Sequence, residues 1–450
     1  MGVPEVDTVV AGAGIAGLAA ALELQGRGRE VLVIDPSDRP GGVMRTDHVA
    51  GFVVERGPNT AQVKAPMRQF LGARGLEGAL LPARPASRLR HLLREGRLVR
   101  VPTSPLGLLS TSLLSARGKL RLLAEPLMRR GDGRAESVAE FVSRRAGDEV
   151  VRGLVGPFLT GLYAGDESQL GADAVFGTAV DLERRYGSLF LGGVASALSR
   201  RRERGLRGTW SGQHGFGPLA RALSAQLAEP PALGSRVERL TRDGGGWRID
   251  IVAPTGDLAL HARAVVLAVP APAAANALRG VDAEIASALE GIAYAPIVSA
   301  GLGIDPADAR ARIQGFGFLV PREERMRLLG CLFMSQIFPG RAPEGSELLQ
   351  CMLGGVRWPD VVAQTDEALL AALRDDLERS LGYRGDPLVL GLARWARAIP
   401  QPGRDHSSRV RFATERLPAG LALAGSYVSG IGVADALASG LAAASSLSRP

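Results

Sequence analysis

Three glycines and one carboxylate near the N-terminus have the residue types and spacing of a dinucleotide-binding site. Gly12, Gly14 and Gly17 form a GxGxxG pattern, and Asp35 follows it. In such a site the first glycine permits a tight turn, the second lets the backbone approach a pyrophosphate, and the third lets a helix sit close to a strand. The carboxylate would accept hydrogen bonds from ribose hydroxyls and would repel a 2′-phosphate. We therefore expect a dinucleotide without that phosphate.

The elements around these residues add weight to the pattern. Residues 6–11 are a short apolar run rich in β-branched side chains, an Ala- and Leu-rich segment follows the glycines to about Arg27, and residues 30–34 lead into Asp35. We expect strand, tight turn, helix and strand, with the pyrophosphate at the positive end of the helix dipole. A glycine-rich turn in another kind of α/β unit is the alternative.

Two later segments are expected near the same site. Gly41 and Gly42 precede Arg45, an arginine that could serve the cofactor or a substrate anion. A further turn and strand follow over residues 51–59. Near the C-terminus, residues 421–447 predict a strand, a glycine-rich turn and an Ala-rich helix, whose N-terminus offers a second helix end to an anionic ligand.

Length and composition bound the class of protein. At 450 residues the chain exceeds the size at which one core keeps growing, so we expect two or three domains. Hydrophobic residues make up 46% and charged residues 22%, which excludes a disordered or fibrous protein. Cys331, Cys351 and five histidines lack metal-ligand spacing, so neither a metal site nor a disulfide framework is predicted.

Charge and hydropathy narrow the expected surroundings. The N-terminus carries no basic leader, and no apolar run reaches the ~20 residues that cross a bilayer, so we expect a cytoplasmic protein. The net charge of +8 is compatible with nucleic acid, an anionic membrane or an acidic substrate, but an arginine bias also arises from GC-rich coding. No aromatic residues interleave with the arginines of residues 199–207, so this stretch predicts a linker and no nucleic-acid partner.

The middle of the chain changes from strand to helix patterns. Residues 88–102 predict a β-hairpin around Glu95 and Gly96. Residues 104–187 are mostly helical, with leucines at helical spacing among arginines. Such a basic amphipathic region either lies on an anionic membrane or packs as a helical domain.

The second half predicts two groups of strands. Residues 237–262 indicate a three-strand meander, and residues 264–268 a separate, buried parallel strand. Strand-like runs between residues 298 and 395, interrupted by a helix over 365–381, predict one large mixed sheet. This sheet would form the substrate-binding domain.

Together the motifs resemble the flavin amine oxidase superfamily and, within it, the protoporphyrinogen oxidase family. The wider resemblance rests on GGVMR at residues 41–45, GPN at 57–59 and AGSYVSGIGV at 424–433. The narrower one rests on GLYAGD at 161–166, GFGFLVP at 315–321, LGCLFMSQIFP at 329–339, and Trp395 with IPQ at 399–401. These motifs are spread over nearly the whole chain.

The resemblance implies an FAD-dependent oxidoreductase that converts protoporphyrinogen IX to protoporphyrin IX, removing six electrons in three flavin turnovers. Molecular oxygen would re-oxidise the flavin and yield hydrogen peroxide, in keeping with the absence of a second GxGxxG for a nicotinamide cofactor. Hydride transfer coupled to aromatisation needs no strong base or metal, so we assign neither. A homodimer and peripheral contact with the inner face of the cell membrane follow from the resemblance alone.

The resemblance also places substrate residues. Arg90 would pair with a propionate, the alternative being a solvated hairpin arginine. Ile297, Ile313 and Phe333 match apolar positions that sandwich the macrocycle, the alternative being buried core. Gly161 matches a glycine whose backbone lies against the substrate, where a side chain would obstruct approach.

The implied fold is α/β: a Rossmann-like FAD-binding domain with a mixed-sheet substrate domain and a helical domain. The domains expected are FAD-binding at 1–87, 205–285 and 410–450, substrate-binding at 88–103 and 286–409, and helical at 104–204. The residues expected to contact FAD are Gly12, Gly14, Ile15, Ala16, Gly17, Asp35, Gly41, Gly42, Arg45, Gly57, Pro58, Asn59, Val237, Trp395, Gly425, Ile431, Gly432 and Val433.

Several departures from the family pattern bear on the substrate rather than the cofactor. Asp35 stands where glutamate is usual, residues 214–217 read HGFG without the family's glutamine, and Pro402 and Ala434 replace a common aromatic and a common asparagine. Coproporphyrinogen III, which differs from protoporphyrinogen IX in carrying propionates in place of vinyl groups, is therefore the alternative substrate.

Three other classes of protein rank lower. Amine oxidases carry a lysine over the flavin, and residues 297–303 hold none. Carotenoid desaturases lack the GFGFLVP segment. A non-catalytic relative, such as the GDP-dissociation inhibitors of small GTPases, would not need the complete glycine fingerprint.

Overall fold

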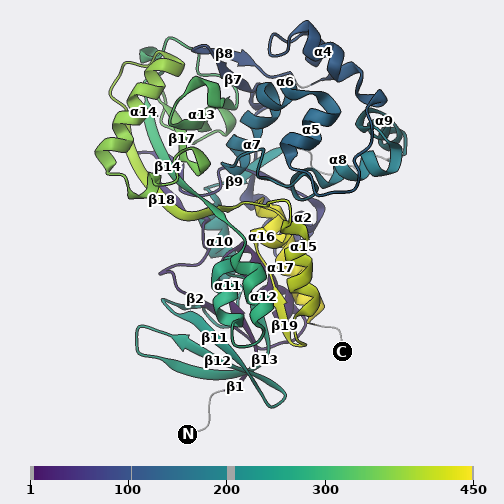
Figure 1. Cartoon of the computed structure of the whole chain (residues 1–450). Helices are drawn as coiled ribbons and strands as arrows, with labels where there is room; N and C mark the ends of the chain where they lie inside the picture. Colours follow the sequence, from purple (N-terminus) through teal and green to yellow (C-terminus); the bar gives the residue numbers. More distant parts are fainter. Residues whose placement is uncertain (1–4, 103, 200–207, 448–450) are drawn as a thin grey trace.

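The computed structural model describes residues 5–102, 104–199 and 208–447, which contain two seven-stranded sheets, two smaller sheets and a helical region (Figure 1). One sheet carries the dinucleotide motif at one end of the molecule. The second sheet and the helical region lie side by side at the other end. The linker expected over residues 199–207 and the domain boundary at residue 204 fall almost entirely outside the described residues.

The first sheet is built around parallel strands, as the glycine motif requires. Its order is β10 (Ala232–Leu233), β2 (Val31–Asp35), β1 (Glu5–Ala11), β13 (Leu258–Leu267), β12 (Gly246–Val252) and β11 (Arg236–Asp243), and β19 (Leu421–Leu423) also pairs with β13. β10, β2, β1, β13 and β19 are mutually parallel, whereas β12 and β11 form the antiparallel meander.

One strand of this sheet corrects the sequence interpretation. The segments expected as two strands, the end of the meander and residues 264–268, form the single strand β13. Its first half pairs with antiparallel β12 and its second half with parallel β19, while β1 runs along its other side. The burial pattern of β13 changes from alternating to continuous at Ala264, where the strand becomes covered on both faces.

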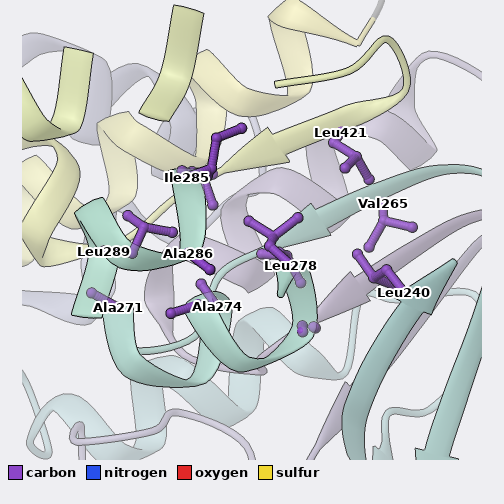
Figure 2. Close-up of a cluster of buried hydrophobic side chains, with 14 of the residues drawn as sticks. Leu240, Val265, Ala271, Ala274, Leu278, Ile285, Ala286, Leu289 and Leu421 are labelled. Atoms are coloured by element: carbon purple, nitrogen blue, oxygen red, sulfur yellow. The ribbon is translucent and has the colours of Figure 1, made fainter. Parts of the chain in front are cut away.

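Helices cover both faces of the first sheet. Val9 and Val10 point to opposite faces, as neighbours in a strand do. The Val10 face packs against α1 (Ile15–Gly26) and α17 (Val433–Ser446). The Val9 face packs against α11 (Ala271–Leu278), α12 (Ala283–Glu290) and α15 (His406–Arg416), and Figure 2 shows Leu278 close to Val265 and Leu421 in this core.

Two expected domain boundaries cut helices of this core. A boundary at residue 285 divides α12, and one at residue 410 divides α15. Both helices contribute buried side chains to the core on the Val9 face, including Ile285, Leu289 and Ala413. Both helices therefore belong wholly to the cofactor-binding region.

The second sheet is the expected mixed sheet with the expected hairpin at its edge. Its order is β18 (Leu388–Pro400), β14 (Tyr294–Ile304), β17 (Glu347–Gly354), β16 (Leu328–Phe333), β15 (Gly317–Leu319), β7 (His91–Arg94) and β8 (Arg97–Arg100). β7 joins β15 in parallel, and the other pairs are antiparallel. The helix α14 (Asp366–Leu381), capped by Thr365, packs its leucines against this sheet.

The helical region is confirmed as predominantly helical. It contains α3 (Pro105–Ser110), α4 (Ala116–Leu123), α5 (Val138–Ala146), α6 (Asp148–Val150), α7 (Gly156–Tyr163), α8 (Ala172–Tyr186) and α9 (Leu189–Ser199), with a π-helical turn at Val151–Val155. The fully buried Arg145 forms an ion pair with Glu125 inside it. Within the described residues, every helix is too short or too polar to span a membrane.

Short elements connect the three regions. They are β3 (Thr46–Val49), β4 (Phe52–Glu55), β5 (Ala61–Gln62), α2 (Ala65–Gly72), β6 (Leu80–Pro82), β9 (Thr209–Gly212), α10 (Phe216–Ser224), α13 (Met334–Ile337) and α16 (Ser426–Ser429). β5, β9 and β6 form a small sheet that had not been predicted, because each strand is too short to show a periodic pattern.

Candidate active site

The turn between β1 and α1 shows what each glycine of the motif does. Gly12 has a φ of +106°, and a Cβ there would lie 2.5 Å from the carbonyl oxygen of Ala268. A Cβ at Gly17 would lie 1.8 Å from the carbonyl oxygen of Gly12. A Cβ at Gly14 would meet nothing within 4 Å, and no side chain caps α1. The positive end of the helix dipole therefore faces open space suited to a pyrophosphate.

Ile15 and Ala16 form the first turn of α1 and are buried. Only their backbone could face a phosphate group in that space. Gly42 borders the same space, because a Cβ at Gly42 would lie 3.2 Å from the Cα of Gly14. Gly41 lies beside the same turn, and its N–H donates to the carbonyl oxygen of Ala13 at 2.8 Å. The two glycine segments are thus brought together, as expected.

Asp35, which was expected to bind a ribose, binds backbone N–H groups of the protein. Its carboxylate accepts hydrogen bonds from the backbone N–H of Ala13 at 2.6 Å and of Ser37 at 2.8 Å, and its side chain is buried. The short aspartate therefore holds the glycine turn in place. Each carboxylate oxygen has a further lone pair, so contact with a ribose remains a proposal.

The far end of β2 also brings Val237 near this carboxylate. β10 pairs with β2 so that Leu233 lies beside Asp35, and the N–H of Ser235 bonds to the carbonyl oxygen of Asp35 at 3.0 Å. Val237 lies two residues further, at the start of β11, and is half-buried. Contact of Val237 with the adenosine end of a dinucleotide remains a proposal.

Arg39 supports the Gly41–Gly42 turn and was not predicted. Its guanidinium donates to the carbonyl oxygens of Gly42 at 3.0 Å and Met44 at 3.3 Å. Burial, and then the charge of Arg45, lower its pKa. The chain offers 52 arginines as candidates, and nothing in the local pattern marks this one. Arg45 itself is exposed and pairs with Asp47 at 3.3 Å.

The segment after β4 joins the cofactor region to the second sheet. A Cβ at Gly57 would lie 1.9 Å from the carbonyl oxygen of Val43, so only glycine fits. The indole Nε1 of Trp395 donates to the carbonyl oxygen of Arg56 at 2.7 Å. Pro58 follows as a half-buried residue, and the amide oxygen Oδ1 of Asn59 is buried without a protein partner.

A second helix begins at the same edge of the first sheet. β1 and β19 are both parallel to β13, so α1 and α17 start on the same side. A Cβ at Gly440 would lie 2.0 Å from the carbonyl oxygen of Ala16, which shows how closely the two helices pack. Gly425 has a φ of +130°, and Gly432 forms the N-cap of α17 without a side-chain cap.

Two apolar residues flank this second helix start. Ile431 packs against the buried cluster of the helical region, and Val433 is buried with Ile15. The turn over residues 425–432 also contains the short helix α16, where only a glycine-rich turn was expected.

Ile297 lies where the second sheet approaches the cofactor region. It is paired with Trp395 across β14 and β18, and Trp395 in turn contacts Arg56. Ile297 shares a small buried cluster with Ala164 and Leu329. The structure therefore places Ile297 beside the segment expected to hold the flavin.

Ile313 and Phe333 lie in one buried cluster of the second sheet. Both belong to the core between the second sheet and α14, and Phe333 is completely buried, with its ring 6.0 Å from that of Phe318. Phe333 pairs with Leu349, and Leu349 pairs with Leu302, which is five positions along β14 from Ile297. Ile297 belongs to a different buried cluster, and contact of the three side chains with a macrocycle remains a proposal.

Gly161 and Arg90, which were expected to bind substrate, each lie against another side chain of the protein. A Cβ at Gly161 would lie 2.2 Å from the side chain of Leu319, so the glycine allows α7 to pack closely on β15. Arg90 is exposed, with its guanidinium 4.6 Å from the ring centroid of Phe316. Partial burial lowers the pKa of Arg90. Within the described residues, no carboxylate forms an ion pair with it.

The contacts between the α7 region and the second sheet involve residues that were not predicted from the sequence. Arg357 donates to the carbonyl oxygen of Val320 at 2.8 Å and to the hydroxyl of Thr160 at 3.2 Å, and burial lowers its pKa to about 10. Asp166 accepts from Arg322 at 2.8 Å. Asp166 lies within the GLYAGD motif, so the motif itself was the available signal, whereas the two arginines carried none.

The residues present fit FAD. The open space at Gly14 suits a pyrophosphate, two helix starts face one edge, and the buried Oδ1 of Asn59 lacks a partner at the segment that joins the two sheets. Among the described residues, no cluster of His, Cys, Asp and Glu could hold a metal ion. This fold and site define an FAD-dependent oxidoreductase with a separate substrate-binding sheet.

Comparison with known proteins gives the family. Residues 15–448 match the model of the flavin containing amine oxidoreductases, and the chain belongs to this family. It is 33% identical to the chloroplastic protoporphyrinogen oxidase of Nicotiana tabacum, over 95% of this chain and 82% of that one. It is 27% identical to the coproporphyrinogen III oxidase of Bacillus subtilis, over 97% of both chains.

Solved structures agree in fold. A protein of Exiguobacterium sp. 255-15, provisionally named protoporphyrinogen oxidase, superposes with a TM-score of 0.82 at 25% identity, covering 99% of both chains. The cyclohexylamine oxidase of Brevibacterium oxydans has a TM-score of 0.68 at 19% identity, over 99% of this chain and 100% of that one, which concerns the fold alone. The predicted fold class, the FAD cofactor and the oxidoreductase class are confirmed.

Proposed function

We propose that this protein oxidises protoporphyrinogen IX to protoporphyrin IX in heme biosynthesis. The observation that carries the proposal is the similarity to plant protoporphyrinogen oxidases over almost the whole chain, including the substrate-binding sheet and not only the dinucleotide motif. Bound FAD would accept hydride from the substrate and would be re-oxidised by molecular oxygen.

The side chains have positioning tasks in this reaction. Ile297 offers apolar surface beside the segment joined to Trp395, where it would orient the macrocycle and exclude water. Gly161 would keep α7 and β15 close together behind the substrate. Arg90 would pair with a propionate, since it has no carboxylate partner among the described residues and one face is already desolvated by Phe316.

The test is to incubate the purified holoenzyme in air with protoporphyrinogen IX or coproporphyrinogen III and to follow porphyrin fluorescence. Faster formation of protoporphyrin supports the proposal. Silence with both substrates contradicts it. Oxygen as acceptor is tested in the same assay, because oxidation that fails in air but proceeds with a quinone would exclude it.

Coproporphyrinogen III is the second candidate. The match to the Bacillus subtilis enzyme over nearly the full length of both chains favours it. A substrate with more propionates needs more cations. Arg90 has no carboxylate partner among the described residues, whereas Arg357 is bonded to protein oxygens. A preference for coproporphyrinogen III in the fluorescence assay would establish this alternative.

We also propose peripheral contact with an anionic membrane at the inner face of the cell membrane. Apolar side chains of α4, the turn after it and α9 are exposed, and the exposed fractions are 68% for Leu120, 83% for Leu127 and 62% for Phe190. Exposed arginines lie on the same elements, among them Arg117 and Arg129. Apolar groups flanked by cations favour an anionic surface.

Co-sedimentation with vesicles tests the membrane proposal. The Leu127→Ser variant should bind phosphatidylglycerol vesicles less than the native protein, whereas Leu258→Ser, at an exposed leucine of the first sheet, should not differ. Equal binding by both variants contradicts the proposal. Dimerisation through this patch would appear instead as a change in sedimentation velocity.

A further inference from the structure

An ion pair joins two segments that border the proposed FAD site. The ammonium of Lys64 donates to the carboxylate of Asp435, 371 positions away in the sequence. Lys64 precedes α2 and follows β5, which continues the segment containing Asn59. Asp435 lies in the first turn of α17, after the turn containing Gly432. The pair therefore links the segment joined to the second sheet with the second helix start.

The carboxylate of Asp435 lies over the start of its own helix. A Cβ at Gly432 would lie 2.7 Å from its Oδ2, and one at Gly430 would lie 3.3 Å from the same oxygen. Tyr163 is also buried. Burial and, after it, the negative charge of Asp435 raise the pKa of the Tyr163 hydroxyl. A negative charge thus sits at the positive end of the α17 dipole and offsets it.

Left alone, this carboxylate would oppose any negative charge on a ligand at the helix start. A two-electron-reduced flavin carries such a charge at neutral pH. We infer that Lys64 is a positioning residue that neutralises Asp435 and so keeps the start of α17 favourable to the reduced flavin. The inference rests on the proposed position of FAD and concerns the charge there.

The residue type at position 64 agrees with a specific role. Lysine occupies only Lys64 and Lys119 in a chain with 54 basic residues. A lysine ammonium is a compact point charge, whereas a guanidinium is a wider planar group with five donors. Lys119 lies on α4 in the helical region and offers a matched control.

The experiment measures the reduction equilibrium of bound FAD against a reference dye, without oxygen and without porphyrinogen. Lys64→Gln leaves Asp435 unpaired and should shift the equilibrium toward oxidised flavin by about three- to fivefold. Asp435→Asn should shift it toward reduced flavin. The double variant should return close to the native value, and Lys119→Gln should not differ from it.

The double variant separates charge from simple structural support. If Lys64 only tethers α2 to α17, the double variant should be at least as disturbed as Lys64→Gln, and this result would overturn the inference. An unchanged equilibrium in both single variants would also overturn it. If Lys64→Gln loses FAD, the Asp435→Asn variant still tests the inference, because a shift toward oxidised flavin in that variant would overturn it. Failure of the native protein to bind FAD would instead contradict the proposed function.

Discussion

The cofactor region and the substrate region differ in which atoms build the site. Around FAD, backbone and glycines define the shape: Gly12, Gly17 and Gly57 each stand where a Cβ would overlap a carbonyl oxygen. In the second sheet, side chains from separate strands define it, and Ile297 and Phe333 belong to different buried clusters. A site made of backbone tolerates no side chain, whereas a site made of side chains can be repacked.

This difference explains why one region binds a constant ligand and the other accommodates relatives with different substrates. The backbone cradle presents the same N–H groups whatever the neighbouring side chains are. In the second sheet we propose that specificity depends on individual side chains such as Arg90. Variants of the two regions should therefore fail in different ways.

The largest effect is expected at the phosphate cradle. Gly14→Val adds atoms only to open space, so the protein should fold but lose FAD, with affinity reduced at least a hundredfold because the pyrophosphate can no longer approach. Flavin absorbance after gel filtration measures retention. Gly26→Val, on the same helix and equally open, should retain FAD. Gly17→Val should not fold, and full FAD retention by Gly14→Val would contradict the comparison.

The same contrast explains what could be predicted from the sequence. The glycine motif, both helix starts and most strands were predicted, because backbone requirements restrict residue type locally. The buried cluster that contains Phe333 also includes leucines of α14, which is distant in the sequence, so the sequence alone could not predict the surroundings of Phe333. The supporting role of Arg39 depends on two carbonyl oxygens that leave no sequence signal.

The second prediction separates core from substrate contact. Phe333→Ala should lower the free energy of unfolding by about 3–5 kcal/mol, because Phe333 is completely buried. Ile297→Ala should cost less stability and should raise KM, because Ile297 lies beside Trp395. Urea unfolding and steady-state kinetics measure the two effects. A stable Phe333→Ala protein with a raised KM would show that Phe333 contacts the substrate.

The third prediction concerns Glu55, which is completely buried where the two regions meet. Burial raises its pKa from 4.5 to about 7, against hydrogen bonds from Thr46 and the N–H of Phe216. The folded protein then binds this proton more tightly than the unfolded chain does. Glu55 should therefore lower stability by about 3 kcal/mol as pH rises from about 4.5 to 7, with no further change above.

Urea unfolding at pH 5 and pH 8 checks this expectation. Glu55→Gln keeps one acceptor oxygen, for the N–H of Phe216, and cannot ionise, so its stability should fall less over this range than that of the native protein. The exposed Glu95→Gln variant is the control. Equal pH dependence of the native protein and Glu55→Gln would show that Glu55 ionises normally in the folded state.

The smallest effect is expected at Arg90. Its guanidinium is exposed on one side, so loss of one charge-assisted pair should raise KM by about tenfold for Arg90→Ala and change kcat less than twofold. Arg97→Ala, on the same hairpin and equally exposed, should leave both constants unchanged. An unchanged KM would remove Arg90 from the substrate site. A rise in KM with FAD affinity intact would show that specificity resides in side chains that can be changed without disturbing the backbone cradle.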